Sequence, residues 1–385
     1  MGGAVDVVVI GGGVIGLSVA RELRRAGVDR VVVLEKEAAV GQGSSSRANG
    51  GVRAQFTTKS NIEFSAFSIT ELERLDRETG LLGFRQTGYL LLSGTEAGER
   101  SLRAALELQR SLGVAVEWLT PAEALERAPF LRPDGLRGAT FHARDGFLDP
   151  HGVVAALRQD AERLGARIVT GAEVVAVHRT AGGALEVVTP GRALRARWLV
   201  NAAGPAAGRV ASLLSVELPV APVRRNLAYV REPAGPGQLI PMCVDLDTGV
   251  LVRREVGGGY VVAWSDPDDP PGWDTTVDPR FLEGLASWVG NRFPFLEDAP
   301  IDPRQCWAGL YPETPDHHAV VGPAPEVPDL VHCAGFGGHG VMHAPAAGRA
   351  VAELLTLGRC ATFDLHPLRP SRFAEGDLVV ETAVL

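Results

Sequence analysis

The fold is decided by the stretch Val5-Asp6-Val7-Val8-Val9-Ile10-Gly11-Gly12-Gly13-Val14-Ile15-Gly16 near the start of the chain. Its apolar first half is short and β-branched, which is typical of a strand buried on both faces. Gly11, Gly13 and Gly16 have the spacing G-x-G-x-x-G in the turn into an amphipathic helix. The first glycine permits a tight turn, the second lets backbone N–H groups approach a pyrophosphate, and the third lets helix and strand pack closely. The pyrophosphate then lies at the positive end of the helix dipole.

An acidic residue completes this unit. A second apolar run, Val31–Leu34, ends at Glu35, where a carboxylate can bind the ribose hydroxyls of an adenosine. The same negative charge disfavours a 2′-phosphate on that ribose. A glycine-rich turn alone is weak support in a chain with 46 glycines, and its alternative is an ordinary βαβ turn. Because strand, helix, second strand and acid stand in register, the stretch predicts an adenine dinucleotide site.

The composition is that of an ordinary soluble globular protein with two lobes. The chain has 385 residues, of which 45% are hydrophobic and 22% charged. Its net charge of −8 disfavours a nucleic-acid partner. The 4 cysteines are widely spaced, which predicts neither a disulfide framework nor a zinc site and fits a reducing compartment. The apolar run from Val5 to Ala20 carries Asp6 and lacks a basic start, so we expect a cytoplasmic protein with no signal peptide and no membrane span.

Helices and strands alternate along the chain. Apolar periodicity predicts helices over 60–77, 98–112, 121–128, 150–164, 279–292 and from the turn 335–340 to Leu357. It predicts strands over 89–92, 138–142, 167–169, 174–177, 198–204, 227–230, 250–253, 260–264 and 330–334. Asp149 and Pro150 are typical of a helix start.

This order of elements predicts an α/β, two-lobed (α+β) fold. A discontinuous, Rossmann-like dinucleotide domain is expected over residues 1–80, 145–214 and 323–385. A mainly antiparallel β domain for the substrate, over 81–144 and 215–322, is inserted between these parts.

Four motifs, in order along the chain, carry a family resemblance. They are the opening fingerprint, the loop from Gly43-Ser44-Ser45 to Arg53, the strand and turn Asn201-Ala202-Ala203-Gly204-Pro205, and Gly309-Leu310-Tyr311 to Asp316 followed by Gly335-Phe336-Gly337-Gly338-His339-Gly340. The segment Arg369–Phe373 also looks like the end of sarcosine oxidase β-type chains. Over nearly its whole length the chain resembles FAD-dependent amine and amino-acid oxidoreductases of the sarcosine oxidase, glycine oxidase and D-amino acid oxidase group.

The resemblance implies FAD as the cofactor. Backbone N–H groups of residues 337–341 would face the flavin pyrimidine at the positive end of the following helix, which favours the negative charge that collects there on reduction. The alternative is a helix N-terminus that merely packs tightly. Some family members tether flavin through a cysteine at the position of Gly309, and others through a histidine in the loop 44–53, which has none here. We therefore expect non-covalent FAD.

The implied cofactor-binding residues are Gly11, Gly13, Val14, Ile15, Gly16, Glu35, Lys36, Ser44, Ser45, Arg47, Gly50, Gly51, Val174, Ala203, Gly204, Gly309, Gly335, Gly337, Gly338, His339, Gly340, Val341 and Met342. Two lysines of the monomeric sarcosine oxidases have no counterpart. Met342 replaces the one that holds substrate carboxylate, and no lysine follows Lys59 to promote oxygen reactivity near the flavin. Not every oxidase of the group uses that lysine, so the electron acceptor stays open between O2 and a quinone- or dye-type acceptor.

Three residues are candidates for contact with the substrate. Arg53 matches the loop arginine that grips substrate carboxylate in sarcosine oxidases, where two parallel N–H donors meet two oxygens; its alternative is a solvated surface role. Tyr311 lies where family members project a polar residue toward the substrate, and its alternative is a core aromatic. His339 touches the flavin edge or, like His343, is a structural histidine.

The remaining polar and aromatic candidates favour structural roles. Tyr260 and Trp264 alternate on one strand, and core packing is favoured over a role in the pocket. Asp316 is interpreted as a turn-former and Asp149 as a helix cap. No Ser-His-Asp set, pair of carboxylates or metal cluster can be assembled, so no metal is expected.

The resemblance implies an enzyme that oxidises the C–N bond of a small, secondary amino acid such as sarcosine or proline. A hydride passes from the α-carbon to flavin N5 and the imine hydrolyses afterwards, while the protein positions the substrate and tunes charge. One alternative is a hydroxy-acid or glycerol-phosphate type dehydrogenase. Another is a flavoprotein subunit or assembly factor active only with a partner. The exact substrate, its stereochemistry and the choice between homo- and hetero-oligomer stay open.

Overall fold

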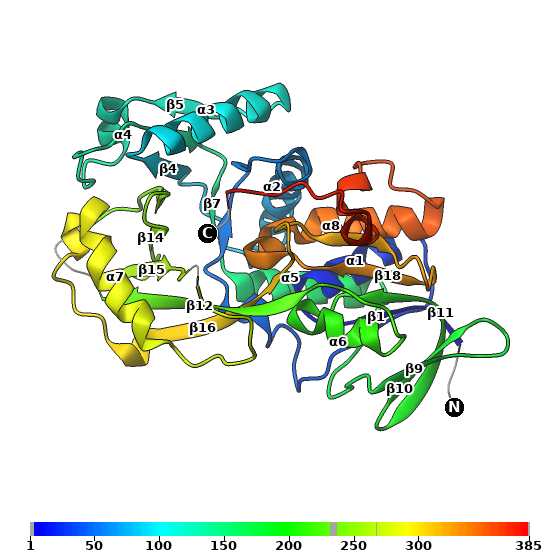
Figure 1. The fold of residues 1–385 in the computed structure, drawn as a ribbon. Helices are drawn as coiled ribbons and strands as arrows, with labels where there is room; N and C mark the ends of the chain where they lie inside the picture. The colour runs from blue at the N-terminus through cyan, green and yellow to red at the C-terminus, as the bar shows by residue number, and fades with distance from the viewer. Residues whose placement is uncertain (1–3, 232–236, 267, 384–385) are drawn as a thin grey trace.

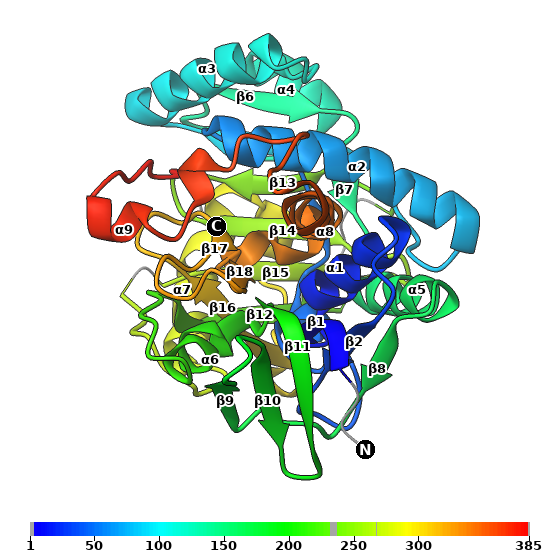
Figure 2. The same ribbon diagram turned by 90° about the vertical axis from the view of Figure 1, so that its right-hand side faces the viewer.

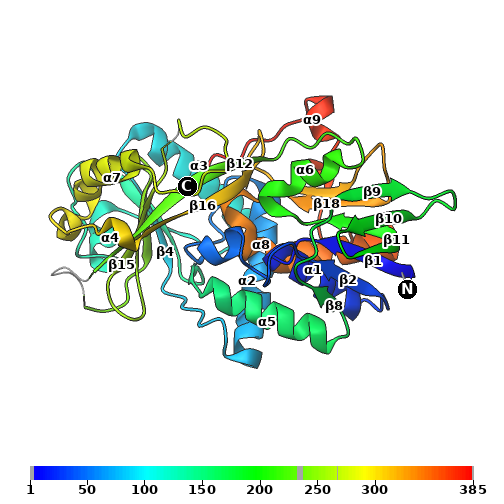
Figure 3. The same cartoon turned by 90° about the horizontal axis from the view of Figure 1, so that it is seen from below.

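A computed structural model describes residues 4–231, 237–266 and 268–383. Two sheets, each backed by helices, form two lobes that lie side by side (Figures 1 and 3). The first lobe holds the sheet that contains the opening strand, and the second lobe holds a mainly antiparallel sheet. The predicted α/β class is confirmed.

The first sheet has a parallel core in the order β18-β11-β1-β2-β8. Strand β17 adds to β18 and the hairpin β9–β10 adds to β11, all antiparallel. The strands of this sheet are β1 (Ala4–Ile10), β2 (Val31–Leu34), β8 (Arg167–Val169), β9 (Ala176–Arg179), β10 (Leu185–Thr189), β11 (Arg192–Asn201), β17 (Val320–Pro323) and β18 (Leu330–Ala334).

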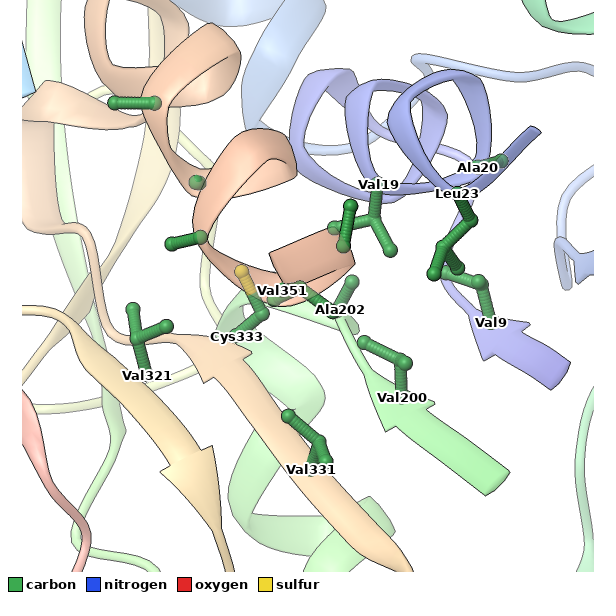
Figure 4. Close-up of a cluster of buried hydrophobic side chains, with 14 of the residues drawn as sticks. Val9, Val19, Ala20, Leu23, Val200, Ala202, Val321, Val331, Cys333 and Val351 are labelled. Atoms are coloured by element: carbon green, nitrogen blue, oxygen red, sulfur yellow. The ribbon is translucent and has the colours of Figure 1, made fainter. Parts of the chain in front are cut away.

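Helices cover both faces of the first sheet. On one face the apolar side chains of β1, β11 and β18 pack against α1 (Val14–Arg25) and α8 (Gly340–Leu357), as Figure 4 shows. The other face packs against α6 (Ala207–Ser212) and the hairpin β9–β10. Figure 2 shows α1, α5 (Pro150–Arg163) and the long α2 (Lys59–Thr79) on one side of the molecule. Burial on both faces explains why β1 is a continuous apolar run.

The second sheet has the order β16-β12-β15-β14-β13-β4-β6-β5. All its neighbours are antiparallel except the parallel pair β13 and β4. Its strands are β4 (Tyr89–Ser93), β5 (Glu117–Leu119), β6 (Gly138–His142), β12 (Ala221–Val230), β13 (Met242–Asp245), β14 (Val250–Arg254), β15 (Tyr260–Trp264) and β16 (Cys306–Glu313). One face is closed by an apolar cluster with α4 (Pro121–Arg127) and α7 (Pro279–Arg292), and α3 (Glu96–Ser111) packs on the other.

Short elements join the lobes. Strand β3 (Gly51–Val52) pairs with β7 (Gly146–Phe147), and the long pair β12–β16 runs from the second lobe toward the first (Figure 3). Helix α9 (Arg372–Glu375) lies near the end of the chain. The ends of β16 and β3 therefore lie where the two lobes meet.

The predicted elements agree with the observed ones at most positions, with three corrections. Strand β11 covers Arg192–Asn201, whereas the pattern predicts a strand over 198–204. Residues 174–175 precede strand β9, which begins at Ala176, so the strand expected over 174–177 starts too early. Strand β12 begins at Ala221 instead of at residue 227, because its first half carries Arg224 and Arg225, which hide the apolar pattern. The division into domains stays a prediction; its ranges include residues 1–3, 232–236, 267 and 384–385, which lie outside the described part of the chain.

Candidate functional site

The glycine turn between β1 and α1 is closed to any larger residue. Gly11 has φ +109°, and a Cβ there would lie 2.3 Å from the carbonyl oxygen of Ala202 at the end of β11. A Cβ on Gly16 would lie 1.9 Å from the carbonyl oxygen of Gly11. The predicted tight turn and close packing are thus both present in the backbone geometry.

The acid at the end of β2 is held by this turn. Glu35 is buried; its Oε2 accepts a hydrogen bond from Gly12 N–H (2.7 Å) and its Oε1 accepts one from Glu37 N–H (2.9 Å). Gly13, the N-cap of α1, offers no side chain, and the hydroxyl of Ser45 accepts from Val14 N–H at 3.2 Å. Carboxylate, hydroxyl and helix N-terminus therefore stand together at one edge of the first sheet.

The loop after β2 is fastened to strand β16. The Ser44 hydroxyl donates to the Leu310 carbonyl (2.5 Å), Arg47 Nη1 donates to the Ala308 carbonyl (2.6 Å), and Trp307 Nε1 donates to the Arg47 carbonyl (3.0 Å). A Cβ on Gly309 would lie 3.0 Å from Arg47 Cβ. The second and fourth sequence motifs are thus in direct contact.

The last glycine-rich motif meets the same strand. Residues Gly337–His339 form a 3-10 turn before α8, and His339, the N-cap of α8, makes no capping hydrogen bond with its side chain. A Cβ on Gly338 would lie 2.6 Å from the ring of Tyr311, so only glycine allows this approach. The start of α8 is therefore in direct contact with the ring of Tyr311 on β16.

The two histidines of this turn are buried. His339 is 7% exposed and its ring meets the edge of Phe56 at 4.7 Å between centroids. The Nε2 of His343 lies 2.8 Å from the Ser65 hydroxyl. Burial, with the nearby Arg53 charge, holds the pKa of both histidines well below 6.5. Both rings are therefore neutral at pH 7, and the choice between a structural role and a contact with the flavin stays a prediction.

Arg53 is a buried cation. It is 2% exposed, its guanidinium lies 4.0 Å from the Phe56 ring centroid, and its Nη1 and Nη2 donate to the carbonyls of Gln55 and Ala383. Among the described residues no acid lies within 4.0 Å of its nitrogens. Burial lowers the pKa of Arg53, yet a guanidinium stays charged in proteins. The solvated surface role is therefore wrong, and the site holds a positive charge without a hydrogen-bonded acid.

Tyr311 lies between two arginines. Its ring centroid is 5.5 Å from the Cζ of Arg225, and the charges of Arg225 and Arg53 both act on its hydroxyl. Burial outweighs them and raises the pKa of Tyr311, so the phenol keeps its proton. Arg225 pairs in register with Gly309 and therefore shares the sheet face of Tyr311. The Nε of Arg225 is buried and has no hydrogen-bond partner among the described residues.

Sequence reasoning missed Arg225 because the strand that it predicted begins only at residue 227, whereas β12 begins at Ala221. Two adjacent arginines inside a strand that continues into an apolar run are the signal that points to it. It also missed Glu381, a fully buried carboxylate near the end of the chain. Nothing in the local pattern of that segment distinguishes Glu381 from a surface residue.

Some predicted residues contribute only backbone or lie apart. The side chains of Val14 and Met342 are buried in an apolar cluster. Lys36 is exposed and its Nζ lies 3.3 Å from Glu37. The predicted residues not placed above, Ile15, Gly50, Gly51, Val174, Ala203, Gly204, Gly335, Gly340 and Val341, lie in or beside the turns at the ends of β1, β11, β18 and β3 or, for Val174, just before β9.

Three residues that the sequence analysis interprets as structural are Tyr260, Asp149 and Asp316. Tyr260 is a core residue whose ring centroid lies 4.9 Å from that of Phe295, and Asp149 caps α5 by accepting from His151 N–H, as predicted. The interpretation of Asp316 as a turn-former is confirmed, since this residue lies in the turn after β16 and its Oδ1 accepts from His318 N–H at 3.3 Å, but the interpretation is incomplete. Its carboxylate forms a buried pair with Arg372, with Nε 2.7 Å from Oδ2 and Nη2 2.9 Å from Oδ1. Sequence spacing could not reveal a pair between the end of β16 and α9.

A separate cavity of about 300 Å³ lies beside β7. Its lining includes Arg85, Phe147, Arg253 and Glu255, and none of the predicted site residues. In the part of the chain that the structure describes, no group of three or more His, Cys, Asp or Glu residues could hold a metal ion. Nor is any described helix both long and apolar enough to cross a membrane.

The residues at the lobe junction fit FAD. The N-terminus of α1 and that of α8 both lack a side-chain cap of their own, and such termini bind phosphate or a ring that gains negative charge. Glu35 stands ready for ribose hydroxyls, and the glycine turns leave room for close approach. The sequence pattern described as "FAD dependent oxidoreductase" (DAO) matches residues 6–354. The chain belongs to this family.

Relatives of the DAO family chain span nearly all of it. "FAD-dependent oxidoreductase domain-containing protein 1" of Bos taurus is 31% identical over 99% of this chain and 87% of that protein. "Glycine oxidase" of Geobacillus kaustophilus is 30% identical over 95% of this chain and 97% of that protein. The crystal structure of L-proline dehydrogenase from P. horikoshii superposes with a TM-score of 0.92 and 28% identity, and covers 98% of this chain and 100% of that one. This DAO family protein is therefore an FAD-dependent oxidoreductase.

Proposed function

We propose that this chain oxidises the C–N bond of a small, secondary amino acid of the sarcosine or proline kind. The observation that carries the proposal is Arg53, a buried guanidinium with no acid in hydrogen-bond range among the described residues. An unpaired buried cation is costly, and an α-carboxylate of the substrate would supply the missing anion. The likeness to structures titled L-proline dehydrogenase and glycine oxidase supports an amino acid as substrate.

The proposed roles of the side chains follow from their charge states. Arg53 binds the carboxylate and so orients the α-carbon. Tyr311, protonated, donates a hydrogen bond beside it, and the neutral ring of His339 avoids a second positive charge next to the substrate amine. FAD, when bound, supplies the hydride acceptor. Hydrolysis of the resulting imine needs no protein base.

The proposed cofactor site is formed by the glycine turn with Glu35, by the loop that contains Ser44 and Ser45, and by the turn before α8. We propose that FAD is bound without a covalent link, because Gly309 replaces the tethering cysteine and the loop 44–53 holds no histidine. Denaturation should release intact FAD into solution. Flavin that stays on the precipitated chain would contradict this part.

The proposed acceptor is a quinone or dye more readily than O2, because no lysine follows Lys59. Stopped-flow mixing of the reduced protein with air-saturated buffer tests this point. Reoxidation fast enough to sustain turnover would assign the chain to the oxidases instead.

Anaerobic bleaching of the flavin absorbance tests the substrate class. The panel contains sarcosine, L-proline, D-proline, glycine and alanine, with lactate and glycerol 3-phosphate as hydroxy compounds. We expect the secondary amino acids to bleach the flavin fastest. Bleaching by a hydroxy compound alone would favour the hydroxy-acid or glycerol-phosphate dehydrogenase alternative.

A second candidate function is a flavoprotein subunit that needs a partner. It is favoured by three consecutive exposed apolar residues near the end of the chain, Leu378, Val379 and Val380, which are 41%, 48% and 51% exposed. On this alternative none of the panel compounds bleaches the isolated protein although its flavin is bound.

A further inference from the structure

The C-terminal segment 377–383, named here the C-terminal strap, reaches the proposed substrate site. In Figure 1 the red end of the chain leaves the first lobe and runs past the start of α2. The strap is attached to the first lobe where Glu381 N–H donates to the Asp316 carbonyl at 3.1 Å, next to the buried pair of Asp316 with Arg372. The strap therefore leaves a rigid point and ends beside Arg53.

The buried carboxylate of Glu381 holds the strap in place. It is fully buried and accepts hydrogen bonds from Thr57 N–H (3.0 Å), the Thr58 hydroxyl (2.7 Å), Asn61 Nδ2 (3.0 Å) and Ala383 N–H (2.9 Å). No basic group lies within 4.0 Å among the described residues. Burial alone would raise the pKa of Glu381, but these hydrogen bonds outweigh it and lower the pKa, so the group is ionised at pH 7.

Glu381 lies at the positive end of helix α2. Thr58 is the N-cap of α2, yet its own side chain makes no capping bond. Glu381 accepts hydrogen bonds from the side chains of Thr58 and Asn61 at this end of the helix, where an anion is stabilised by the helix dipole. The charge of Glu381 is therefore stabilised by N–H and O–H dipoles at hydrogen-bond distance and, from farther away, by the charge of Arg53.

Two residues beyond Glu381, the carbonyl of Ala383 accepts a hydrogen bond from Arg53 Nη2. Ala383 N–H donates to Glu381, so the carboxylate fixes the carbonyl that Arg53 contacts. The Gln55 carbonyl accepts from Nη1 on the other side, and the Phe56 ring stacks against the guanidinium. These bonds use two of the five N–H donors and leave the plane of the fork with little freedom to rotate.

We propose that Glu381 is a positioning residue for the substrate site, which acts through Ala383 to aim the Arg53 guanidinium at the substrate carboxylate. The inference rests on the proposed function, in which Arg53 binds that carboxylate. It assigns to the C-terminal strap a role in substrate affinity that a helix cap alone would not have. The chemistry recognised is an α-carboxylate on a small amine.

The test compares Glu381→Gln with Glu375→Gln in the full-length, FAD-loaded protein. Glu375 is exposed on α9 and pairs with Arg369, so it offers the same chemical change nearby without contact to the site. We expect Glu381→Gln to raise KM for the best amino acid about ten-fold and to leave kcat within about two-fold, since orientation of the carboxylate is lost. Glu375→Gln should change neither.

A binding measurement separates the inference from the proposed function. Acetate, a carboxylate without an amine, is titrated while the flavin absorption spectrum is followed. We expect Kd for acetate to rise about ten-fold in Glu381→Gln. If no amino acid is oxidised but acetate binding weakens in this way, the proposed function is wrong and the positioning role of Glu381 is supported. If amino acids are oxidised and KM and Kd of Glu381→Gln stay at wild-type values, the positioning role is wrong and the proposed function is supported.

A second variant separates positioning from helix capping. Asn61→Ala removes one partner of Glu381 on α2 but leaves the link to Ala383. We expect it to lower Tm with KM close to that of the wild type, and hydrogen exchange in 377–383 to be faster in Glu381→Gln than in Asn61→Ala. If both variants lose the same amount of Tm and keep the wild-type KM, Glu381 only stabilises the end of α2, and the proposal is wrong.

If Glu381→Gln does not fold, Glu381→Asp, which keeps the charge on a shorter side chain, replaces it with the same expected rise in KM.

Discussion

The glycine turn at the start of α1 and the substrate-facing side of the site, defined as the surroundings of Arg53 and Tyr311, are held together in opposite ways. In the turn, Gly12 and Glu35 are hydrogen-bonded across 23 residues of chain, and the whole unit is one βαβ segment. On the substrate-facing side, Arg53 is held by Ala383 across 330 residues, and the Arg47 loop by Ala308 across 261. The first region is specified by local spacing of glycines, whereas the second exists only once both lobes and the end of the chain have folded together.

This difference separates the jobs of the two regions. The turn depends on backbone shape, which tolerates almost no side chain at Gly11. The substrate-facing side depends on the placement of charge, in a buried setting where an unpaired group is costly. Changes in the turn should therefore abolish cofactor binding, and changes around Arg53 should alter affinity while the cofactor stays bound.

The largest effect is expected from Gly11→Ala. The new Cβ would lie 2.3 Å from the Ala202 carbonyl oxygen at φ +109°, so the turn must shift. We expect the free energy of unfolding to fall by at least about 3 kcal/mol and bound FAD to be lost. Flavin absorbance of the purified protein and thermal unfolding measure both. Gly43→Ala is the matched control, because a Cβ there meets nothing within 4 Å. Retention of FAD by Gly11→Ala would show that the turn can relax.

The next effect concerns the buried pair that anchors the end of the chain. Arg372→Met leaves the Asp316 carboxylate buried without its partner; the two side chains are 0% and 1% exposed. We expect the free energy of unfolding to fall by about 3–5 kcal/mol, measured by urea denaturation. Arg304→Met removes an exposed pair with Asp302 and should leave the free energy of unfolding close to that of the wild type. Equal costs for the two variants would mean that the Asp316 site admits water.

The sequence predicted the first region almost completely and the second only in part. Strand β1, helix α1 and the position of Glu35 follow from periodicity and glycine spacing, because their contacts are close in sequence. Arg53 and Tyr311 were found through the family resemblance and not through the pattern of residues. Arg225 lies in the half of β12 before residue 227, where the apolar pattern predicts no strand, and Glu381 carries no local signal, since its partners Thr57, Thr58 and Asn61 lie at the other end of the chain. Long-range pairing of polar groups is set by the folded lobes, which a linear pattern does not contain.

A smaller effect is expected for Arg53→Met, which keeps length but removes charge. Charge-assisted hydrogen bonds contribute about 1.5–3 kcal/mol, so kcat/KM for amino acids should fall about ten- to a hundred-fold. FAD content should stay near that of the wild type, in contrast to Gly11→Ala. Arg100→Met, in an exposed pair with Glu96, is the control. Loss of flavin would place Arg53 in the cofactor site, and normal turnover would assign the carboxylate to Arg225 or Tyr311.

The smallest effect tests a contact that is local in sequence but belongs to the substrate-facing side. His317 Nδ1 lies 3.0 Å from Glu313 Oε2, and this hydrogen bond raises the pKa of His317 above its ordinary 6.5. Because the folded pKa is the higher one, the stabilisation is fully present below about pH 6.5 and is lost as pH rises through the raised value. His317 is 37% exposed in its side chain, so solvent limits the contribution to less than about 1 kcal/mol.

Urea denaturation between pH 5 and pH 9 should therefore give a stability difference between wild type and His317→Gln that shrinks as pH rises. His178→Gln, a change of an exposed histidine on strand β9, is measured beside it as the control. Glu313 also lies beside the start of α8, since a Cβ on Gly337 would be 3.1 Å from its Oε1. If the difference instead grows with pH, the hydrogen bond to Glu313 does not raise the pKa of His317, and this contact does not stabilise the charged imidazole.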